Sequence, residues 1–325
     1  MDRRAFLMSA ASMAALPEFA AAQSPARTLK IGYLSAQQQA SFAPYLTAFR
    51  QGFGELGYVE GQNLVIEYRF GDDQLDRVPG LAAQLVKSGV ELIIAQGAAV
   101  SEIAKLNLAV PIVYVFSGDP VSAGLAESLS RPRGNMTGLT LMAAELNSKR
   151  LEILRDIVPG LRRVAIIANP EHHGVNLERR NSEETGQRLG IEIRYYPTPS
   201  PTALDAALVA MKADPAQAIS VFSDGFAVQN RKLIFDFAAD QRIPVVAGWS
   251  VFARSGAICS YGPLQSEQYR RLASYVDRIA KGAKPSELPI QQPTKFETII
   301  NMKVAKTLGL SIPPALLASA DELIE

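Results

Sequence analysis

The chain has 325 residues, of which 48% are hydrophobic, and its formal net charge is +1. A near-neutral chain without a basic stripe is not typical of nucleic-acid-binding proteins, and no run after the first 30 residues reaches the length of about 20 that a membrane-spanning helix needs. Once an amino-terminal export segment is set aside, the remaining length indicates two domains of ordinary size.

Residues 1–22 are predicted to be a cleavable export signal. Arg3 and Arg4 precede a short apolar run, and alanines at 20 and 22 form a cleavage site. The arginine pair also matches the twin-arginine export motif, with the Sec route as the alternative. The one cysteine, Cys259, lies far from the cleavage site, which leaves no lipid anchor there and no internal disulfide. We expect a soluble, monomeric periplasmic protein with no stable membrane insertion.

Strands and helices alternate along the next hundred residues. The predicted strands are 29–34, 64–70, 92–95, 112–116 and 135–141, and the predicted helices are 42–56, 78–86, 98–108 and 121–129. This alternation is typical of a parallel sheet with helices on both faces.

A second round of the same alternation follows. Its predicted strands are 163–168, 191–196, 218–222 and 244–247, and its predicted helices are 146–157 and 175–189. Three landmarks recur at one offset of 133 positions: Ile31 with Val164, Gly57 with Gly190, and Pro111 with Pro244 (164 − 31, 190 − 57, 244 − 111). The sequence therefore predicts two similar α/β lobes.

The last third does not begin a third round. It is predicted to contain strands at 257–261 and 296–300, joined by a helix at 266–281 and an extended segment at 282–293, then helices at 302–308 and 314–318. One strand and helix for each lobe gives a first lobe of 28–141 plus 257–283 and a second lobe of 142–256 plus 284–325. The chain would then cross between the lobes three times, near Leu141, Gly256 and Lys284, and three crossings make a hinge.

Polar residues follow the predicted strands of both rounds. In the first round they are Gln96, Gly97 and Ala98 after one strand and Ser117, Gly118 and Asp119 after the next; in the second they are Asn169, Ser223, Asp224 and Trp249. Carboxyl ends of parallel strands meet at one sheet edge, where open α/β folds bind ligands, and two such edges imply a cleft between lobes. An ordinary turn is the alternative for the Gly-Asp-Pro sequence.

These residues suggest a site for a small charged or aromatic solute. Gly97 and the start of the helix after it form a candidate carboxylate site, because a helix amino terminus attracts anions. Asp119 and Asp224 are candidates for binding a ligand ammonium, with turn capping or a surface salt bridge as the alternative. Trp249 is a candidate stacking platform. His172 and His173 are adjacent and have no nearby cysteine, which favours ligand contact over a metal site.

Enzyme motifs are absent from the sequence. It contains no dinucleotide-binding glycine fingerprint, no P-loop and no nucleophile elbow. Cys259 lies in an apolar strand and is interpreted as inert core. We expect a binding protein with no catalytic residue, metal or cofactor.

Several motifs resemble those of a known family. They include ELGYVEGQNLVIEY (55–68), DPVSAGLAESL (119–129), RPRGNMTG (131–138) and, longest, the stretch from YRRLASYVDRIAKGAKPSELPIQQPTKFETIIN at 269 to TLGLSIPPALLASADELI ending at 324. Their order is similar to that in the substrate-binding proteins of ABC transporters, in the group that includes tryptophan- and other aromatic amino-acid-binding members. The resemblance covers essentially the whole mature chain and departs from many relatives at Arg133, a loop position where they have glycine.

The resemblance implies a type I periplasmic-binding fold and a protein that delivers a small solute to a membrane permease driven by an ATPase. The implied solutes are aromatic or branched amino acids and small carboxylates. The resemblance also implies ligand-facing residues at the strand ends: Ser35, Gln96, Gly97, Ala98, Ala99, Ser117, Asp119, Asn169, His172, Ser223, Asp224, Trp249 and Tyr261. Where relatives have Gly-Thr, Gly97-Ala98 lacks the hydroxyl. The alternative function is a soluble periplasmic ligand sensor or co-receptor of a signalling system.

Overall fold

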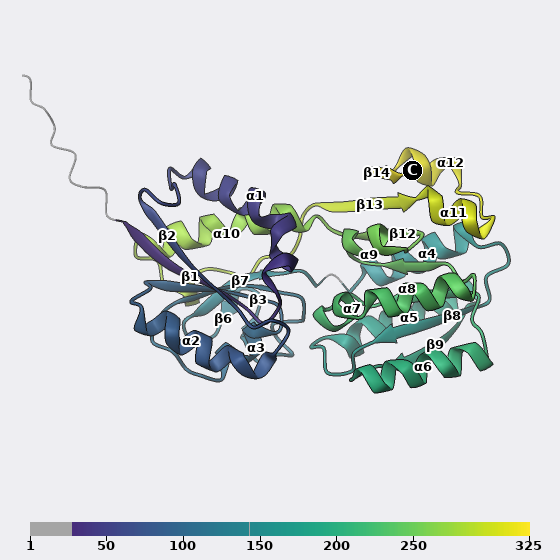
Figure 1. The fold of residues 1–325 in the computed structure, drawn as a ribbon, viewed down its shortest axis with the longest axis horizontal. Helices are drawn as coiled ribbons and strands as arrows, with labels where there is room; N and C mark the ends of the chain where they lie inside the picture. The colour runs from purple at the N-terminus through teal and green to yellow at the C-terminus, as the bar shows by residue number, and fades with distance from the viewer. Residues whose placement is uncertain (1–27, 143) are drawn as a thin grey trace, which may run out of the picture.

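The computed structural model describes residues 28–142 and 144–325, and the predicted export signal lies outside the described residues. Figure 1 shows these residues as two lobes side by side, each with a sheet and flanking helices. The first lobe contains a five-stranded parallel sheet in the order β2-β1-β3-β4-β7. Its strands are β1 (Leu29–Ser35), β2 (Leu64–Phe70), β3 (Leu92–Gln96), β4 (Ile112–Phe116) and β7 (Met136–Thr140).

The second lobe contains a seven-stranded sheet in the order β14-β13-β12-β11-β10-β8-β9. Only the β12–β13 pair is antiparallel. The strands are β8 (Arg163–Ala168), β9 (Glu192–Pro197), β10 (Ala218–Val221), β11 (Val245–Ala247), β12 (Cys259–Pro263), β13 (Phe296–Asn301) and β14 (Glu322–Ile324).

The two sheets share one strand order over their first five strands, which confirms the predicted repeat. In each sheet the first strand lies between the second and the third, and the fourth and fifth follow outward. Strand β12 takes in the second sheet the place that β7 takes in the first, with Val246 and Ala247 of β11 paired to Cys259 and Ser260. The assignment of residues 257–261 to the first lobe is therefore wrong, because this strand completes the second round.

Helices cover both faces of each sheet, and the central strands are therefore apolar and buried along most of their length. Around the first sheet lie α1 (Gln39–Glu55), η1 (Leu75–Arg77), α2 (Val78–Lys87), α3 (Ala99–Ala104), α10 (Gln265–Ala280), η2 (Pro285–Glu287) and the short strands β5 (Ala126–Ser128) and β6 (Arg131–Pro132). Around the second lie α4 (Leu146–Ile157), α5 (Val175–Leu189), α6 (Pro201–Ala213), α7 (Gly225–Gln229), α8 (Arg231–Asp240), α9 (Ser250–Ser255), α11 (Met302–Leu308) and α12 (Pro314–Ala318).

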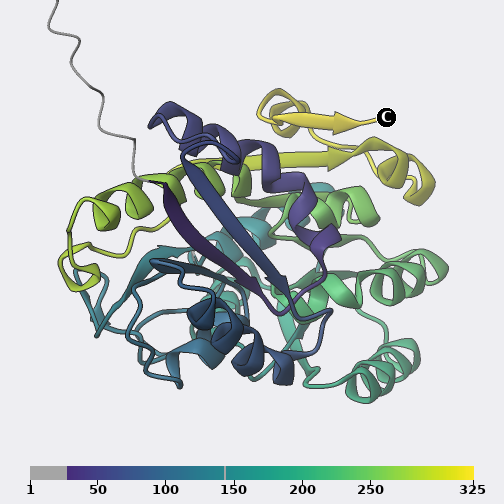
Figure 2. The same ribbon diagram turned by 60° about the vertical axis from the view of Figure 1, so that its left-hand side comes forward.

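The lobes exchange one helix each. Helix α4 follows β7 of the first sheet but packs on α5 and β12 of the second lobe, whereas α10 follows β12 but packs on α1, β4 and β7. Figures 1 and 2 both show α10 alongside α1. The rings of Tyr45 and Tyr269 stack at 4.6 Å between these two helices. A Cβ on Gly52 of α1 would lie 2.1 Å from the Arg270 carbonyl oxygen, and this close approach therefore requires glycine.

The chain passes between the lobes three times, as predicted, but two of the passages differ in position. The first lies between β7 and α4, near Leu141 as expected. The second lies at Leu264 rather than Gly256, because β12 belongs to the second sheet. The third follows Gln291, whose amide donates to Gly138 of the first sheet at 3.1 Å, rather than lying at Lys284. Leu264 donates to Lys295 at 3.0 Å, which places these two passages side by side.

One predicted helix is absent and another is shorter than expected. Residues 121–129 form a turn followed by β5, which pairs antiparallel with β6, and Gly124 has a left-handed φ of 74° that ends any helix there. The helix expected over 98–108 stops at Ala104, and Asn107 has a φ of 46°. In both segments the apolar spacing predicts a helix, but a residue with a left-handed backbone conformation prevents it or follows its early end.

Candidate ligand-binding cleft

Two cavities lie side by side between the lobes, one at the carboxyl ends of the parallel strands and one lined mainly by helices. The histidine compartment, of about 470 Å³, is lined from the first lobe by Gln96, Gly97, Ala98, Phe116 and Ser117, and from the second by Asn169, His172, Asp224, Phe226 and Trp249, among others. The tyrosine compartment, of about 570 Å³, is lined by Tyr45, Gln265, Ser266, Tyr269, Arg231, Arg254 and Glu297, among others. Residues from both lobes therefore face each cavity.

A hydrogen bond between the lobes lies where the two compartments meet. Gln229 Nε2 donates to Asp73 Oδ1 at 2.9 Å, and Gln38 Nε2 of the first lobe donates to Asp73 Oδ2 at 2.7 Å. Asp73, Gln229 and Trp249 line both cavities. Asp72 and Asp73 both have left-handed φ values, 55° and 65°, so this loop holds Asp73 in an uncommon backbone conformation.

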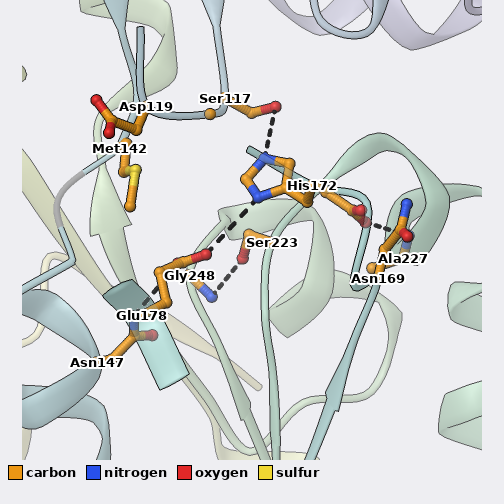
Figure 3. Close-up of polar contacts among 12 residues, drawn as sticks. Ser117, Asp119, Met142, Asn147, Asn169, His172, Glu178, Ser223, Ala227 and Gly248 are labelled. Atoms are coloured by element: carbon orange, nitrogen blue, oxygen red, sulfur yellow. Dashed lines mark hydrogen bonds and ion pairs between the residues drawn. The ribbon is translucent and has the colours of Figure 1, made fainter. Parts of the chain in front are cut away.

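A chain of polar contacts ties the deep side of the histidine compartment to the second lobe (Figure 3). His172 Nε2 lies 3.2 Å from Ser117 Oγ of the first lobe, and His172 Nδ1 lies 3.7 Å from Glu178 Oε2 of α5. Asn147 Nδ2 donates to Glu178 Oε1 at 3.2 Å, and Arg150 Nη1 donates to Asn147 Oδ1 at 2.6 Å. Each of these second-lobe side chains is largely buried, so the contacts hold His172 in one position.

The buried charges of this cluster shift the pKa values of its members. Burial lowers the pKa of His172, but the contact with Glu178 and the charges of Glu178 and Asp224 outweigh burial and raise it above its ordinary value. Burial raises the pKa of Asp224, against the charge of His172 and the Ala227 amide that donates to it at 2.7 Å. Arg150 brings a positive charge toward Glu178 through Asn147, whereas Asp224 lines the cavity without an arginine or lysine partner among the described residues, so an ammonium group could pair with it.

The exit loops of β4 and β8 also meet through their backbones. Asp119 N donates to the His173 carbonyl at 3.0 Å. A Cβ on Gly118 would lie 2.8 Å from that same oxygen, so the two loops approach as closely as glycine allows. Burial, and next the charge of His172, lower the pKa of His173.

Eight of the thirteen predicted ligand-facing residues line the histidine compartment, and five line neither cavity. The eight are Gln96, Gly97, Ala98, Ser117, Asn169, His172, Asp224 and Trp249. The five that lie elsewhere are Ser35, Ala99, Asp119, Ser223 and Tyr261.

Each of these five has a local structural role. Ser35 Oγ donates to Gln96 Oε1 at 2.7 Å and so positions a lining residue. Ser223 Oγ accepts from Gly248 N at 2.9 Å, and Ala99 is fully buried. Asp119 accepts from Val121 N and Ser122 N, both at 3.1 Å, which is the turn-capping alternative. Tyr261 lies in β12 against Phe296.

The carboxylate site expected at Gly97 has little support from the structure. Helix α3 has only six residues, so few peptide dipoles align behind its amino terminus. Among the described residues, no group of three or more His, Cys, Asp or Glu side chains could hold a metal ion.

Sequence reasoning missed the polar residues that bridge the cleft. Asp73 and Gln229 lie in a loop and at a helix end, with no motif around them to single them out. Glu178 and Arg150 lie on helices, where charged residues are ordinarily exposed, yet both are buried here. The unusual feature of Asp73 is its left-handed backbone conformation, which cannot be read from the sequence.

Two α/β lobes with a cleft between them, lined by residues of both, are the architecture of the type I periplasmic-binding fold. Comparison with known proteins agrees. The family described as ABC transporter substrate binding protein matches residues 39–324, so the chain belongs to that family. It is 21% identical over 272 residues to the tyrosine-binding protein of Clostridioides difficile strain R20291, a match that covers 82% of this chain and 78% of that protein.

Solved structures show the same fold. The ABC domain from Streptococcus pneumoniae in complex with L-Trp superposes with a TM-score of 0.84 at 20% identity, over 91% of this chain and 100% of that one. A conserved domain protein from Vibrio cholerae gives a TM-score of 0.82 at 23% identity, with the same coverage. Over residues 28–142 and 144–325, no helix combines the length and the hydropathy that crossing a membrane requires.

Proposed function

We propose that this protein is the periplasmic substrate-binding component of an ABC importer and that it captures an aromatic amino-acid solute in the histidine compartment. It acts by binding alone, without catalysis, and presents its ligand to a membrane permease driven by an ATPase. Membership in the family supports this role. The predicted export signal supports a periplasmic location.

Asp224 is the observation that carries the amino-acid proposal. Its carboxylate is 5% exposed, lines the cavity and has no paired arginine or lysine among the described residues. An ammonium group against it gains a charge-assisted hydrogen bond in a place from which water is largely excluded.

Aromatic side chains at the same compartment supply the second half of the ligand site. Phe116, Phe226 and Trp249 line it, and Trp249 is 9% exposed. Rings of this kind bury an aromatic ligand side chain by stacking or edge contacts. The L-Trp named for the streptococcal structure and the tyrosine named for the clostridial relative have the chemistry that these residues would recognise.

Closure by rotation about the three lobe-to-lobe passages would trap the ligand. The ends of β7, β12 and β13 supply these passages, and two of them are hydrogen-bonded side by side.

A ligand series tests the proposal. The mature protein is titrated with L-tryptophan, with tryptamine, which lacks the carboxylate, and with indole-3-propionate, which lacks the ammonium. We expect L-tryptophan to raise the melting temperature by several degrees at a concentration far above its Kd, because it binds only the folded protein. Indole-3-propionate should bind at least about tenfold more weakly, since it cannot pair with Asp224. Equal binding of all three compounds, or of none, would contradict the proposal.

A further inference from the structure

The two compartments differ in charge. The histidine compartment is lined by the carboxylates of Asp73, Glu102, Glu171 and Asp224, by His172 and His173, and by one lysine, Lys105, which pairs with Glu102 at 2.7 Å. The tyrosine compartment is lined by two carboxylates, Asp73 and Glu297, and by two arginines, Arg231 and Arg254. A ligand that is positive at one end and negative at the other is therefore oriented along the cleft, with its anionic end in the tyrosine compartment.

Arg231 is the cation available to that anionic end. Arg254 makes two hydrogen bonds to Glu322, at 2.7 and 2.6 Å. Arg231 has no carboxylate partner among the described residues, and its Nη1 donates to the Val228 carbonyl at 2.6 Å. Its guanidinium thus keeps donors for a ligand carboxylate, which it can bind in a bidentate manner.

Asp224 and Arg231 line different compartments of the cleft. Asp224 caps α7 and lines the histidine compartment alone, whereas Arg231 begins the next helix, α8, and lines the tyrosine compartment alone. The ammonium and carboxylate of a free amino acid are attached to one carbon, whereas each added residue lengthens a peptide by up to about 3.5 Å. A ligand that contacts both side chains must extend from one compartment into the other, which suits a peptide of two or three residues better than a free amino acid.

Asp73 and Gln229, where the two compartments meet, have the acceptor and the donor that a peptide group needs. Asp73 Oδ1 is an acceptor and Gln229 Nε2 is a donor, and they face each other from opposite lobes at 2.9 Å. A peptide bond presents one N–H donor and one C=O acceptor, and it can replace this hydrogen bond with one to each residue. The left-handed conformation of Asp72 and Asp73 holds the acceptor at this place.

We propose that the tyrosine compartment is a second subsite of the same cleft and that the ligand is a short peptide with an aromatic first residue. Its ammonium lies against Asp224, its first peptide group lies between Asp73 and Gln229, and its carboxylate pairs with Arg231. This inference rests on the proposed function, because it keeps the amino end of the ligand in the histidine compartment.

Calorimetric titration with three probes tests it: L-tryptophan, the dipeptide Trp-Gly, and Trp-Gly with its carboxylate blocked as an amide. In the unaltered protein, Trp-Gly should bind at least about tenfold more tightly than either other probe. In Arg231→Gln, Trp-Gly should fall to the affinity of its amide, while L-tryptophan binding changes less than twofold. Lys232→Gln, on the adjacent exposed position of α8, is the matched control and should alter none of the three.

A second variant tests the peptide-group contact. Gln229→Leu should weaken Trp-Gly severalfold more than it weakens L-tryptophan, because only the dipeptide has a peptide group that loses this contact. If L-tryptophan binds as tightly as Trp-Gly, or if Arg231→Gln leaves Trp-Gly unchanged, the second subsite is overturned while the proposed function stands. If neither compound binds, the proposed function fails together with it.

Discussion

Ser117 and His172 come from different lobes, and their side chains meet at 3.2 Å at the deep side of the cleft. The imidazole also faces Glu178, so one residue joins the first lobe to a buried carboxylate of the second. The protonation state of His172 therefore bears on how the two lobes hold together.

Stability should depend on pH through His172. Its pKa is raised in the folded protein, chiefly by Glu178 and then by Asp224 acting against burial, so the folded state binds the proton more tightly than the unfolded state. The stabilisation is complete below the ordinary histidine pKa of about 6.5 and is lost as pH rises through the raised value. Urea unfolding at pH 6 and pH 8.5 should therefore show a larger gap between the unaltered protein and His172→Gln at the lower pH.

Asp224 and His173 also have shifted pKa values, so the pH dependence of the unaltered protein has several sources. The difference between the unaltered protein and His172→Gln isolates the contribution of His172. Glutamine retains a hydrogen bond to Ser117 but carries no charge toward Glu178. Each unit by which the pKa is raised contributes about 1.4 kcal/mol below the transition. A gap that stays constant between the two pH values would show that folding leaves the pKa of His172 unchanged and would contradict the prediction.

Gly118→Ala should separate the exit loops of β4 and β8. The new methyl group would lie 2.8 Å from the His173 carbonyl oxygen and 2.9 Å from Phe116 Cζ, so both loops must move. We expect a loss of about 1 to 3 kcal/mol in unfolding free energy, measured by urea titration. Gly80→Ala, in α2 with no atom within 4 Å of the added carbon, should be neutral or stabilising.

Asp224→Asn should weaken amino-acid binding without unfolding the protein. Asparagine caps helices as well as aspartate, so the hydrogen bond from Ala227 N to this side chain is retained. Removal of the carboxylate charge should reduce the affinity for L-tryptophan by about tenfold or more. Asp119→Asn is the paired control, because Asp119 lines neither cavity, and equal losses in the two variants would argue against the assigned role of Asp224.

Trp249 should report ligand binding directly. It is the one tryptophan of the chain and lines both compartments, so its emission depends on what occupies them. Titration with L-tyrosine, with excitation at a wavelength that tyrosine does not absorb, should shift or quench the emission. Calorimetric binding of L-tyrosine without any change in emission would place the ligand away from the indole.

Much of the fold could be predicted because its strands are short apolar runs with turn residues at their ends. The parallel strands of both rounds lie close to their expected positions. Strand β12 was predicted correctly but assigned to the wrong lobe, because sequence shows where a strand is and not which sheet edge it joins. Its equivalence to β7 becomes plain only from the shared strand order.

The site was predictable to the extent that it follows the strand ends. Gln96, Ser117, His172 and Asp224 line the cavity because the carboxyl edges of both sheets face each other. Asp119 and Asp224 occupy similar sequence positions, but one caps an exposed turn and the other is buried at the cleft, and this difference depends on the facing lobe. Contacts such as Asp73 with Gln229 join distant segments and have no local signal in the sequence.

The exchange of α4 and α10 has a consequence for folding. The first lobe receives α10 from beyond the second passage, so its core is not complete until most of the chain is present, whereas every element of the second lobe follows the first passage. The arrangement is that of a domain swap enclosed within a single polypeptide. Cutting the chain at the first passage would leave an amino-terminal fragment without α10, which is not expected to fold stably alone, and a carboxyl-terminal fragment that keeps α4 and all seven strands of the second sheet.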